Sequence, residues 1–128
     1  MIGCLNNWVD GWIDWNMVLD KQGGPNWFKN WCVAPVIVDT EADEIYYTPL
    51  YYVMCHFSKY IRPGDVVLAS ESSDEDLMIT AVKNDDQLTA VLFNLSEESK
   101  SYQLTIDNKS VQLSVSPQAL QTIVVPLD

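Results

Sequence analysis

Hydrophobic and polar residues alternate in the second half of the chain, and this alternation predicts a series of short antiparallel strands. Six apolar runs lie between residues 66 and 127, separated by turns rich in Gly, Pro, Asn, Asp or Ser. Tyr102, Leu104 and Ile106 alternate with polar residues, so that strand should have one face in water. The run 88–95 is apolar on both faces, which is typical of a central strand. Together the strands and turns predict an antiparallel β-sandwich or barrel.

The first half has a different pattern, in which one strand is followed by a long loop and then a helix. We expect the strand over residues 10–17. Thr48-Pro49 is typical of a helix start, because Thr can cap free N–H groups and Pro fits the first helical position. Apolar residues then recur at helical spacing as far as Ile61, and Pro63 disfavours further helix. A single strand from a barrel cannot close its own sheet.

Length and charge disfavour several classes of function. The chain has 128 residues, enough for one ordinary domain or for fragments of two. Eighteen acidic residues against seven basic ones give a net charge of −11, which disfavours nucleic acids and anionic membrane surfaces as partners. No apolar run approaches the roughly 20 residues of a membrane span, so we expect no transmembrane segment. The N-terminus has no basic region followed by a long apolar one, so we expect no signal peptide in this chain.

The cysteines and the single histidine do not form a recognisable site. Cys4, Cys32 and Cys55 lack the C-x-x-C spacing of a zinc site, and their odd number does not fit a full disulfide framework. We therefore expect three small buried thiols, no metal and no cofactor. His56 has no G-x-S-x-G nucleophile motif to accompany it, so we expect a packed structural residue.

Two other kinds of motif carry less information. The acidic runs 39–44 and 71–76 lack the glycine that an EF-hand requires, so solvated loops are the expectation. Asn94 and Asn108 each begin an N-x-S triplet and are candidates for N-glycosylation, which hints at a secretory route.

Residues 11–27 combine tryptophans with polar side chains, which suits a sugar-binding cleft because sugar C–H faces pack on flat rings. A buried core lined by Trp, with Asn in turns, explains the same residues, and the pattern alone favours neither reading. Asp14 is a poor catalytic candidate. Sugar hydrolysis with retention needs two carboxyl groups about 5–5.5 Å apart, and Asp14 has no obvious second member nearby in sequence.

Four motifs in one order resemble the C-terminal part of glycoside hydrolase family 30 enzymes, in particular the glucosylceramidase (acid β-glucosidase) group. They are W-x-D-W-N at residues 12–16, G-G-P-N-W at 23–27, A-P-V-I-V-D at 34–39 and H-F-S-K at 56–59. The resemblance is strong over residues 1–65 and looser beyond. It implies a mixed, mainly β fold: the last strand–helix unit of a (β/α)8 barrel in residues 1–64, then an antiparallel β-sandwich in residues 65–128.

The same resemblance implies a function. The parent would be a retaining β-glucosidase that hydrolyses glucosylceramide to glucose and ceramide in sphingolipid metabolism, in the lysosome or secreted. Both catalytic glutamates of the family fall outside this sequence, so the isolated chain is expected to be inactive. The family's sugar-contacting positions correspond to Trp15, Asn30 and Trp31, with Trp12 and Asp14 in support. Glucosylceramide or another β-glucoside and an activator protein are the implied partners.

Two alternatives stay open from the sequence. The chain could be a non-catalytic β-sandwich module that binds glycan or glycolipid, in which case residues 66–128 should fold and bind alone. It could also be a truncated product without function. Its barrel segments, without the rest of the barrel, should then expose apolar surface and aggregate.

Overall fold

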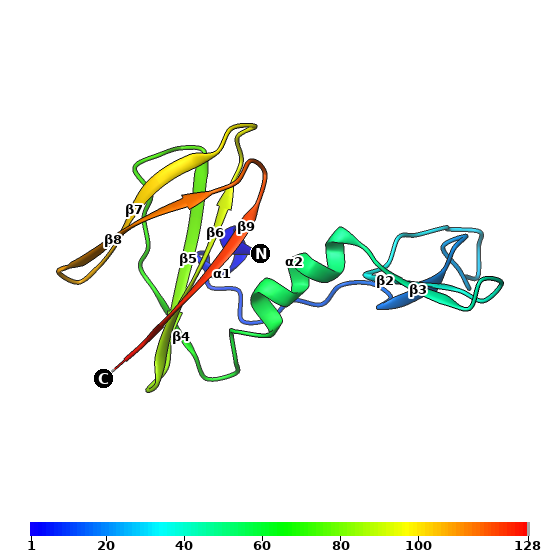
Figure 1. Cartoon of the computed structure of the whole chain (residues 1–128). Helices are drawn as coiled ribbons and strands as arrows, with labels where there is room; N and C mark the ends of the chain where they lie inside the picture. The colour runs from blue at the N-terminus through cyan, green and yellow to red at the C-terminus, as the bar shows by residue number, and fades with distance from the viewer. Residues whose placement is uncertain (128) are drawn as a thin grey trace. The chain divides into compact units, whose positions relative to one another are not determined.

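The computed structural model describes residues 1–127, which form two compact units (Figure 1). One unit comprises residues 11–59. The other comprises residues 1–10 together with the chain from residue 60 onward. The first ten residues therefore belong to the same compact unit as the predicted sandwich. The domain boundary between residues 64 and 65 stays a prediction.

All six strands that the alternating pattern predicts are present in the unit that starts at residue 60. Four of them form one antiparallel sheet in the order β4-β5-β6-β9, and β7 and β8 form a separate antiparallel hairpin. The bounds are β4 Val66–Leu68, β5 Leu77–Lys83, β6 Gln87–Asn94, β7 Lys100–Ile106, β8 Lys109–Val115 and β9 Leu120–Pro126.

The hairpin packs on one face of the four-stranded sheet, as a sandwich requires. Leu77 and Leu92 from the sheet form a buried cluster with Val115 of β8, and Tyr102 of β7 packs against it. The predicted central strand is confirmed, because β6 lies between β5 and β9 and six of its eight residues are buried. The predicted wet face of β7 is also confirmed, since its polar positions are exposed between less exposed apolar ones.

A short helix near the N-terminus belongs to this unit and was not expected from the sequence. Helix α1, Ile2–Leu5, lies against β5, and Ile2 is buried. The side-chain amide of Asn6 donates a hydrogen bond of 2.8 Å to the carbonyl oxygen of Ile79 in β5.

Residues 11–59 contain a three-stranded sheet in the order β1-β2-β3. Strand β1, Val18–Asp20, runs parallel to β2, Val36–Asp39, which pairs with antiparallel β3, Glu44–Tyr47. The expectation of a strand over residues 10–17 is wrong for the described chain. Backbone pairing begins only at Met17, whose carbonyl oxygen accepts a hydrogen bond of 3.0 Å from the Val36 amide. An extended segment does not become a strand where no neighbouring strand supplies hydrogen bonds.

Helix α2, Pro49–Ser58, follows β3 and begins where the sequence predicts. It ends at Ser58, three residues before Ile61. Thr48 occupies the N-cap position, but its hydroxyl does not cap the helix. It donates instead to the carbonyl oxygen of Ala34 at 2.9 Å, and this bond ties the start of α2 to the segment before β2.

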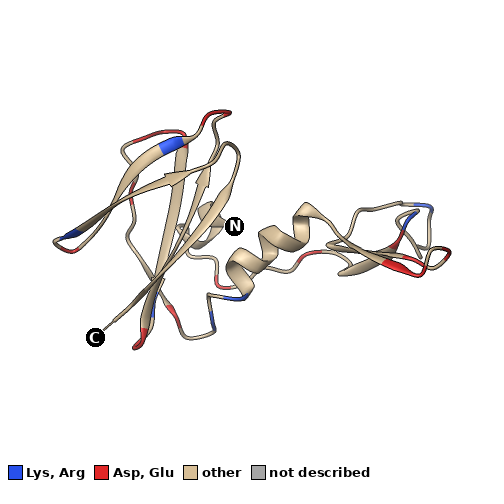
Figure 2. Cartoon of the chain, viewed as in Figure 1, with Lys and Arg blue, Asp and Glu red and all other residues tan. Residues whose placement is uncertain are grey.

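Two further expectations need correction. The three cysteines are free among the described residues, but they are half-buried and not buried. The acidic run 39–44 is not a uniformly solvated loop, because Asp39 ends β2 and is buried. Acidic residues nevertheless gather mainly in the turns of both units (Figure 2).

Candidate functional site

The loop between β1 and β2 and the segment before β1 contain every predicted sugar-contacting residue. Trp15 precedes β1 by three positions and is 74% exposed. Asn30 and Trp31 lie in the loop; Asn30 is exposed and Trp31 is 48% exposed. The structure therefore presents two indole rings and one amide to the surroundings.

The loop starts with a tight turn that is organised by Asp20. The side-chain Oδ1 of Asp20 accepts hydrogen bonds of 2.9 Å from the backbone amides of Gln22 and Gly24. In return, the Asp20 amide donates to the Gly24 carbonyl oxygen at 2.8 Å. An Asp two residues before the turning point is a common signal for such a turn. Asp20, whose carboxylate stabilises this turn, was not identified from the sequence.

Gly23 is required where the two ends of the loop meet. Its φ is +89°, and a Cβ at this position would lie 2.4 Å from the carbonyl oxygen of Cys32. The Cys32 amide donates to the Gly23 carbonyl oxygen at 3.2 Å. The backbone of the returning loop thus crosses directly over the glycine, which only a residue without a side chain permits.

Gly24 provides the surface on which Trp31 lies. A Cβ on Gly24 would be 3.1 Å from Cζ3 of Trp31 and 3.3 Å from Oδ2 of Asp20. The peptide bond that follows, Gly24–Pro25, is cis. The glycine pair therefore allows the indole to pack down on the turn, while about half of its surface stays open.

The backbone around Asn30 is fixed on both sides. Its amide donates to Oδ1 of Asn26 at 3.0 Å, and its carbonyl oxygen accepts a bond of 3.2 Å from the thiol of Cys32. Lys29, just before it, has a φ of +55°. These contacts hold the main chain locally while the Asn30 side chain is exposed.

Asp14 supports Trp15 through the backbone. Its Oδ1 accepts a hydrogen bond of 2.8 Å from the Trp15 amide, and the residue is exposed. Trp12, the other predicted supporting residue, is 47% exposed.

A cluster of charges links the C-terminal ends of β1 and β2. The Lys21 Nζ lies 2.8 Å from Oδ2 of Asp39 and 3.2 Å from Glu41. Oδ1 of Asp39 accepts backbone bonds from Glu41 and Ala42. The Lys21 hydrogen bond lowers the pKa of Asp39, and the bond to Asp39 raises the pKa of Lys21. The parallel strands that carry the loop are thus linked by a buried carboxylate that was expected from the sequence to lie in a solvated acidic run.

The remaining candidate residues do not join this site. His56 lies half-buried in α2, and burial lowers its pKa. Among residues 1–127, no group of three His, Cys, Asp or Glu side chains is arranged to hold a metal ion. No helix in the same range is both long and apolar enough to cross a membrane.

The exposed rings and amide can bind a polar ring with C–H faces, but they supply no reacting carboxylate pair. Asp20 is committed to its turn and Asp14 to the Trp15 backbone. The described chain therefore carries exposed aromatic rings and an amide on a loop held by backbone hydrogen bonds, and a β-sandwich follows along the chain. Exposed aromatic rings beside polar side chains are typical of the carbohydrate-active class of protein.

Comparison with known families gives the identity of that class. Residues 1–61 match the glycosyl hydrolase family 30 TIM-barrel domain, and residues 66–123 match the glycosyl hydrolase family 30 beta sandwich domain. The chain belongs to glycoside hydrolase family 30, as its motifs predict. The predicted fold class, the end of a barrel followed by a β-sandwich, is confirmed by the same two matches.

Individual relatives agree with this assignment. The chain is 40% identical over 93 residues to the lysosomal acid glucosylceramidase of Mus musculus, covering 70% of this chain and 18% of that protein. Among solved structures, SrfJ of Salmonella typhimurium has a TM-score of 0.95 at 30% identity, covering 99% of this chain and 29% of SrfJ. An endo-beta1,6-glucanase has a TM-score of 0.84 at 28% identity, covering 94% of this chain and 28% of the glucanase. The chain thus spans about a fifth of the length of the curated relatives it matches.

Proposed function

We propose that this chain forms part of a retaining β-glucosidase and supplies one wall of its sugar-binding site. The observation that carries the proposal is the loop from Lys21 to Cys32, which holds Trp31 on Gly24 and leaves its ring half open. In this proposal Trp15 and Trp31 pack on the C–H faces of the sugar, and the Asn30 amide bonds to its hydroxyl groups.

The catalytic pair is proposed to lie outside this chain. Retaining hydrolysis needs one carboxylate as nucleophile and a second carboxyl as acid and base, about 5–5.5 Å apart. The carboxylates nearest to the loop in sequence are already engaged by backbone amides. The chain's own residues would therefore bind and orient the sugar, and would not form the glycosyl-enzyme.

The substrate is proposed to be glucosylceramide, cleaved to glucose and ceramide, with a lysosomal or secreted location for the whole enzyme. The name of the mouse relative, lysosomal acid glucosylceramidase, supports this substrate and the lysosomal location. An activator protein that presents the lipid is included as a candidate partner. The glucanase relative supports only a wider class of β-linked glucosides.

The first test is catalytic. The purified chain should show no turnover of a fluorogenic β-glucoside above the rate without protein, because positioning residues cannot replace a nucleophile and an acid. Turnover that Asp14→Ala abolishes would place a catalytic carboxylate inside the chain and overturn the proposal.

The second test is of binding, with methyl β-glucoside as the probe. Saturation transfer by NMR from the chain to the sugar C–H protons should be detectable and should be lost in Trp15→Ala. Trp27→Ala is the matched control, because Trp27 is 93% exposed in the same loop region and has no proposed sugar contact. Equal loss of saturation transfer in both variants, or no loss in Trp15→Ala, would contradict the proposal that Trp15 contacts the sugar.

A further inference from the structure

Two sequons share one motif but have opposite surroundings in the fold. Asn94-Leu95-Ser96 and Asn108-Lys109-Ser110 both satisfy the N-x-S pattern. The proposed sugar wall uses neither of them. Asn94 is 0% exposed, whereas Asn108 is exposed. The tertiary structure therefore separates two sites that the sequence cannot distinguish.

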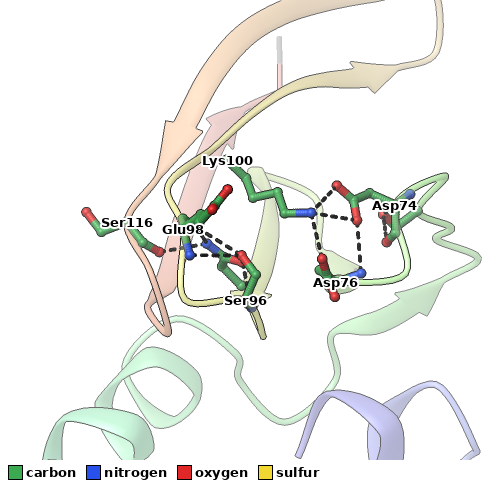
Figure 3. A network of polar contacts seen from close by, with 8 residues as sticks. Asp74, Asp76, Ser96, Glu98, Lys100 and Ser116 are labelled. Carbon is green, nitrogen blue, oxygen red and sulfur yellow. Dashed lines mark hydrogen bonds and ion pairs between the residues drawn. The ribbon is translucent and has the colours of Figure 1, made fainter.

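Asn94 ends β6 and is enclosed by the turn that leads to β7. Its Nδ2 donates hydrogen bonds to the carbonyl oxygens of Glu98 at 2.8 Å and Ser116 at 3.0 Å. Its Oδ1 accepts from the amide and the hydroxyl of Ser96 at 3.0 and 2.9 Å. Figure 3 shows this turn beside the ion pairs of Lys100. A sugar on Nδ2 would replace one of its two N–H groups and would need space inside a filled turn.

Asn108 lies in the two-residue turn between β7 and β8. The last pair of the hairpin is Ile106 with Lys109, so Asp107 and Asn108 alone connect the strands. Asp107 takes a φ of +53°, which Asp tolerates in turns. The whole sequon is exposed, and the turn lies at the tip of the hairpin (Figure 1). A saccharide here would extend into solvent without displacing a described side chain from the core.

We propose that Asn108 is an N-glycosylation site of this chain and that Asn94 is closed to the reaction once the chain has folded. The Asn108 Nδ2 attacks the anomeric carbon of a diphosphate-activated saccharide. The carbon–oxygen bond to the diphosphate breaks, the diphosphate leaves with the electron pair, and a base of the transferase takes the proton lost from Nδ2. In the cell this modification rests on the secretory or lysosomal route in the proposed function, but it does not depend on glycosidase activity.

The structure also determines what happens to chains modified before they fold. Both sequons are open in an unfolded chain, so a transferase can reach either. A saccharide on Asn94 would prevent the turn from Asn94 to Glu98 from closing against Ser116. Folded molecules should therefore carry the saccharide on Asn108 alone.

A direct test compares the folded chain with unfolded peptides. The purified chain and synthetic peptides of residues 88–100 and 102–114 are incubated with a soluble sequon-specific N-glycosyltransferase and UDP-glucose, and each asparagine is mapped by mass spectrometry. Both peptides should gain glucose. The folded chain should gain it on Asn108, with Asn94 occupied about tenfold less or lower, because reaction there requires local opening.

The variant Asn108→Gln serves as the control, because it changes one exposed turn residue and leaves the buried asparagine intact. Its folded form should gain almost no glucose. Glucose on Asn94 of the folded chain at the rate seen in the peptide would overturn the proposal. Absence of glucose on Asn108, in the chain or in its peptide, would overturn it equally, and neither result depends on glucoside turnover.

Discussion

At the scale of single residues, one buried polar side chain stands out because it has no hydrogen-bond partner within residues 1–127. Thr80 lies in β5 opposite Val91 and is 1% exposed. Among the described residues, nothing accepts or donates a hydrogen bond at its hydroxyl. Thr89, in β6, is equally buried, but its hydroxyl accepts a hydrogen bond of 3.3 Å from the side-chain Nε2 of Gln87. The two threonines therefore form a natural comparison.

Thr80→Val should stabilise the chain by about 1 kcal/mol, because an unpaired buried hydroxyl costs roughly 1–3 kcal/mol and valine has nearly the same shape. Thr89→Val should be neutral or destabilising, since it removes a bonded group. Urea unfolding followed by circular dichroism measures both. A lower free energy of unfolding for Thr80→Val would show that its hydroxyl has a partner.

Gly23→Ala should destabilise residues 11–59 by more than about 1 kcal/mol. The new Cβ would lie 2.4 Å from the Cys32 carbonyl oxygen, and alanine is strained at a φ of +89°. Gly11→Ala is the matched control in the same unit, because a Cβ there meets nothing within 4 Å. Unfolding in urea, followed by tryptophan fluorescence, should separate the two variants. Equal midpoints would mean that the loop does not close over Gly23.

The residues of the candidate site were predictable only in part. The motif order at Trp15, Asn30 and Trp31 came from the sequence, and their role as sugar contacts stays a prediction. Asp20 was not identified and Asp39 was expected in a solvated loop, because a carboxylate that accepts backbone hydrogen bonds looks the same in sequence as one in solvent. The hydroxyl of Thr48 was expected to cap its own helix. It donates instead to the carbonyl oxygen of Ala34, 14 residues earlier in the chain.

At the scale of secondary structure elements, ion pairs link strands to neighbouring segments. The hydrophobic pattern predicts where these strands lie but not how they are linked. Lys21 joins the ends of β1 and β2 through Asp39, and Lys100 joins the start of β7 to Asp74 and Asp76 before β5. The Lys100 hydrogen bond lowers the pKa of Asp74, and the pKa of Lys100 is raised by Asp76 and then by Asp74. Both clusters should therefore weaken in acid.

The acid dependence of residues 11–59 has a definite sign. The pKa of Asp39 is lowered in the folded chain, so its contribution to stability is present above the ordinary value of about 3.9. That contribution is lost as the pH falls through the folded pKa. The pKa of Lys21 is raised, so its contribution is complete below about 10.4 and is lost as the pH rises through the folded value.

The urea midpoint, read by tryptophan fluorescence, should therefore fall below about pH 4. Asp39→Asn should lower the midpoint at neutral pH and flatten its fall in acid, because the titrating group is gone. The control is Asp43→Asn, in the exposed turn between β2 and β3, which should leave the acid limb unchanged. An unchanged acid limb in Asp39→Asn would assign the pH dependence to other carboxylates.

At the scale of the whole molecule, a large net charge and exposed aromatic side chains act in opposite directions. Trp27 is 93% exposed and Phe28 is 86% exposed, and the chain carries a net charge of −11. Exposed apolar groups favour self-association, and like charges oppose it. Salt screens the repulsion but leaves the apolar surface unchanged.

Light scattering by the purified chain should thus be low at low ionic strength and rise as salt is added. The double variant Trp27→Gln/Phe28→Gln should remove much of that rise. Val111→Thr, which changes a half-exposed residue of β8, should not. Scattering that is independent of salt in the unmodified chain would show that charge repulsion does not keep the molecules apart.

The sequence by itself determined the six strands of the sandwich, the start of α2 and the family. These features depend on local periodicity, turn residues and motif order, which are all properties of neighbouring positions. Only the tertiary structure decided that β1 begins at Val18, that the first ten residues join the sandwich unit, and that Asn94 is sealed while Asn108 is open. Each of these outcomes depends on which distant backbone or side chain supplies a hydrogen bond or fills a space, and no local pattern contains that information.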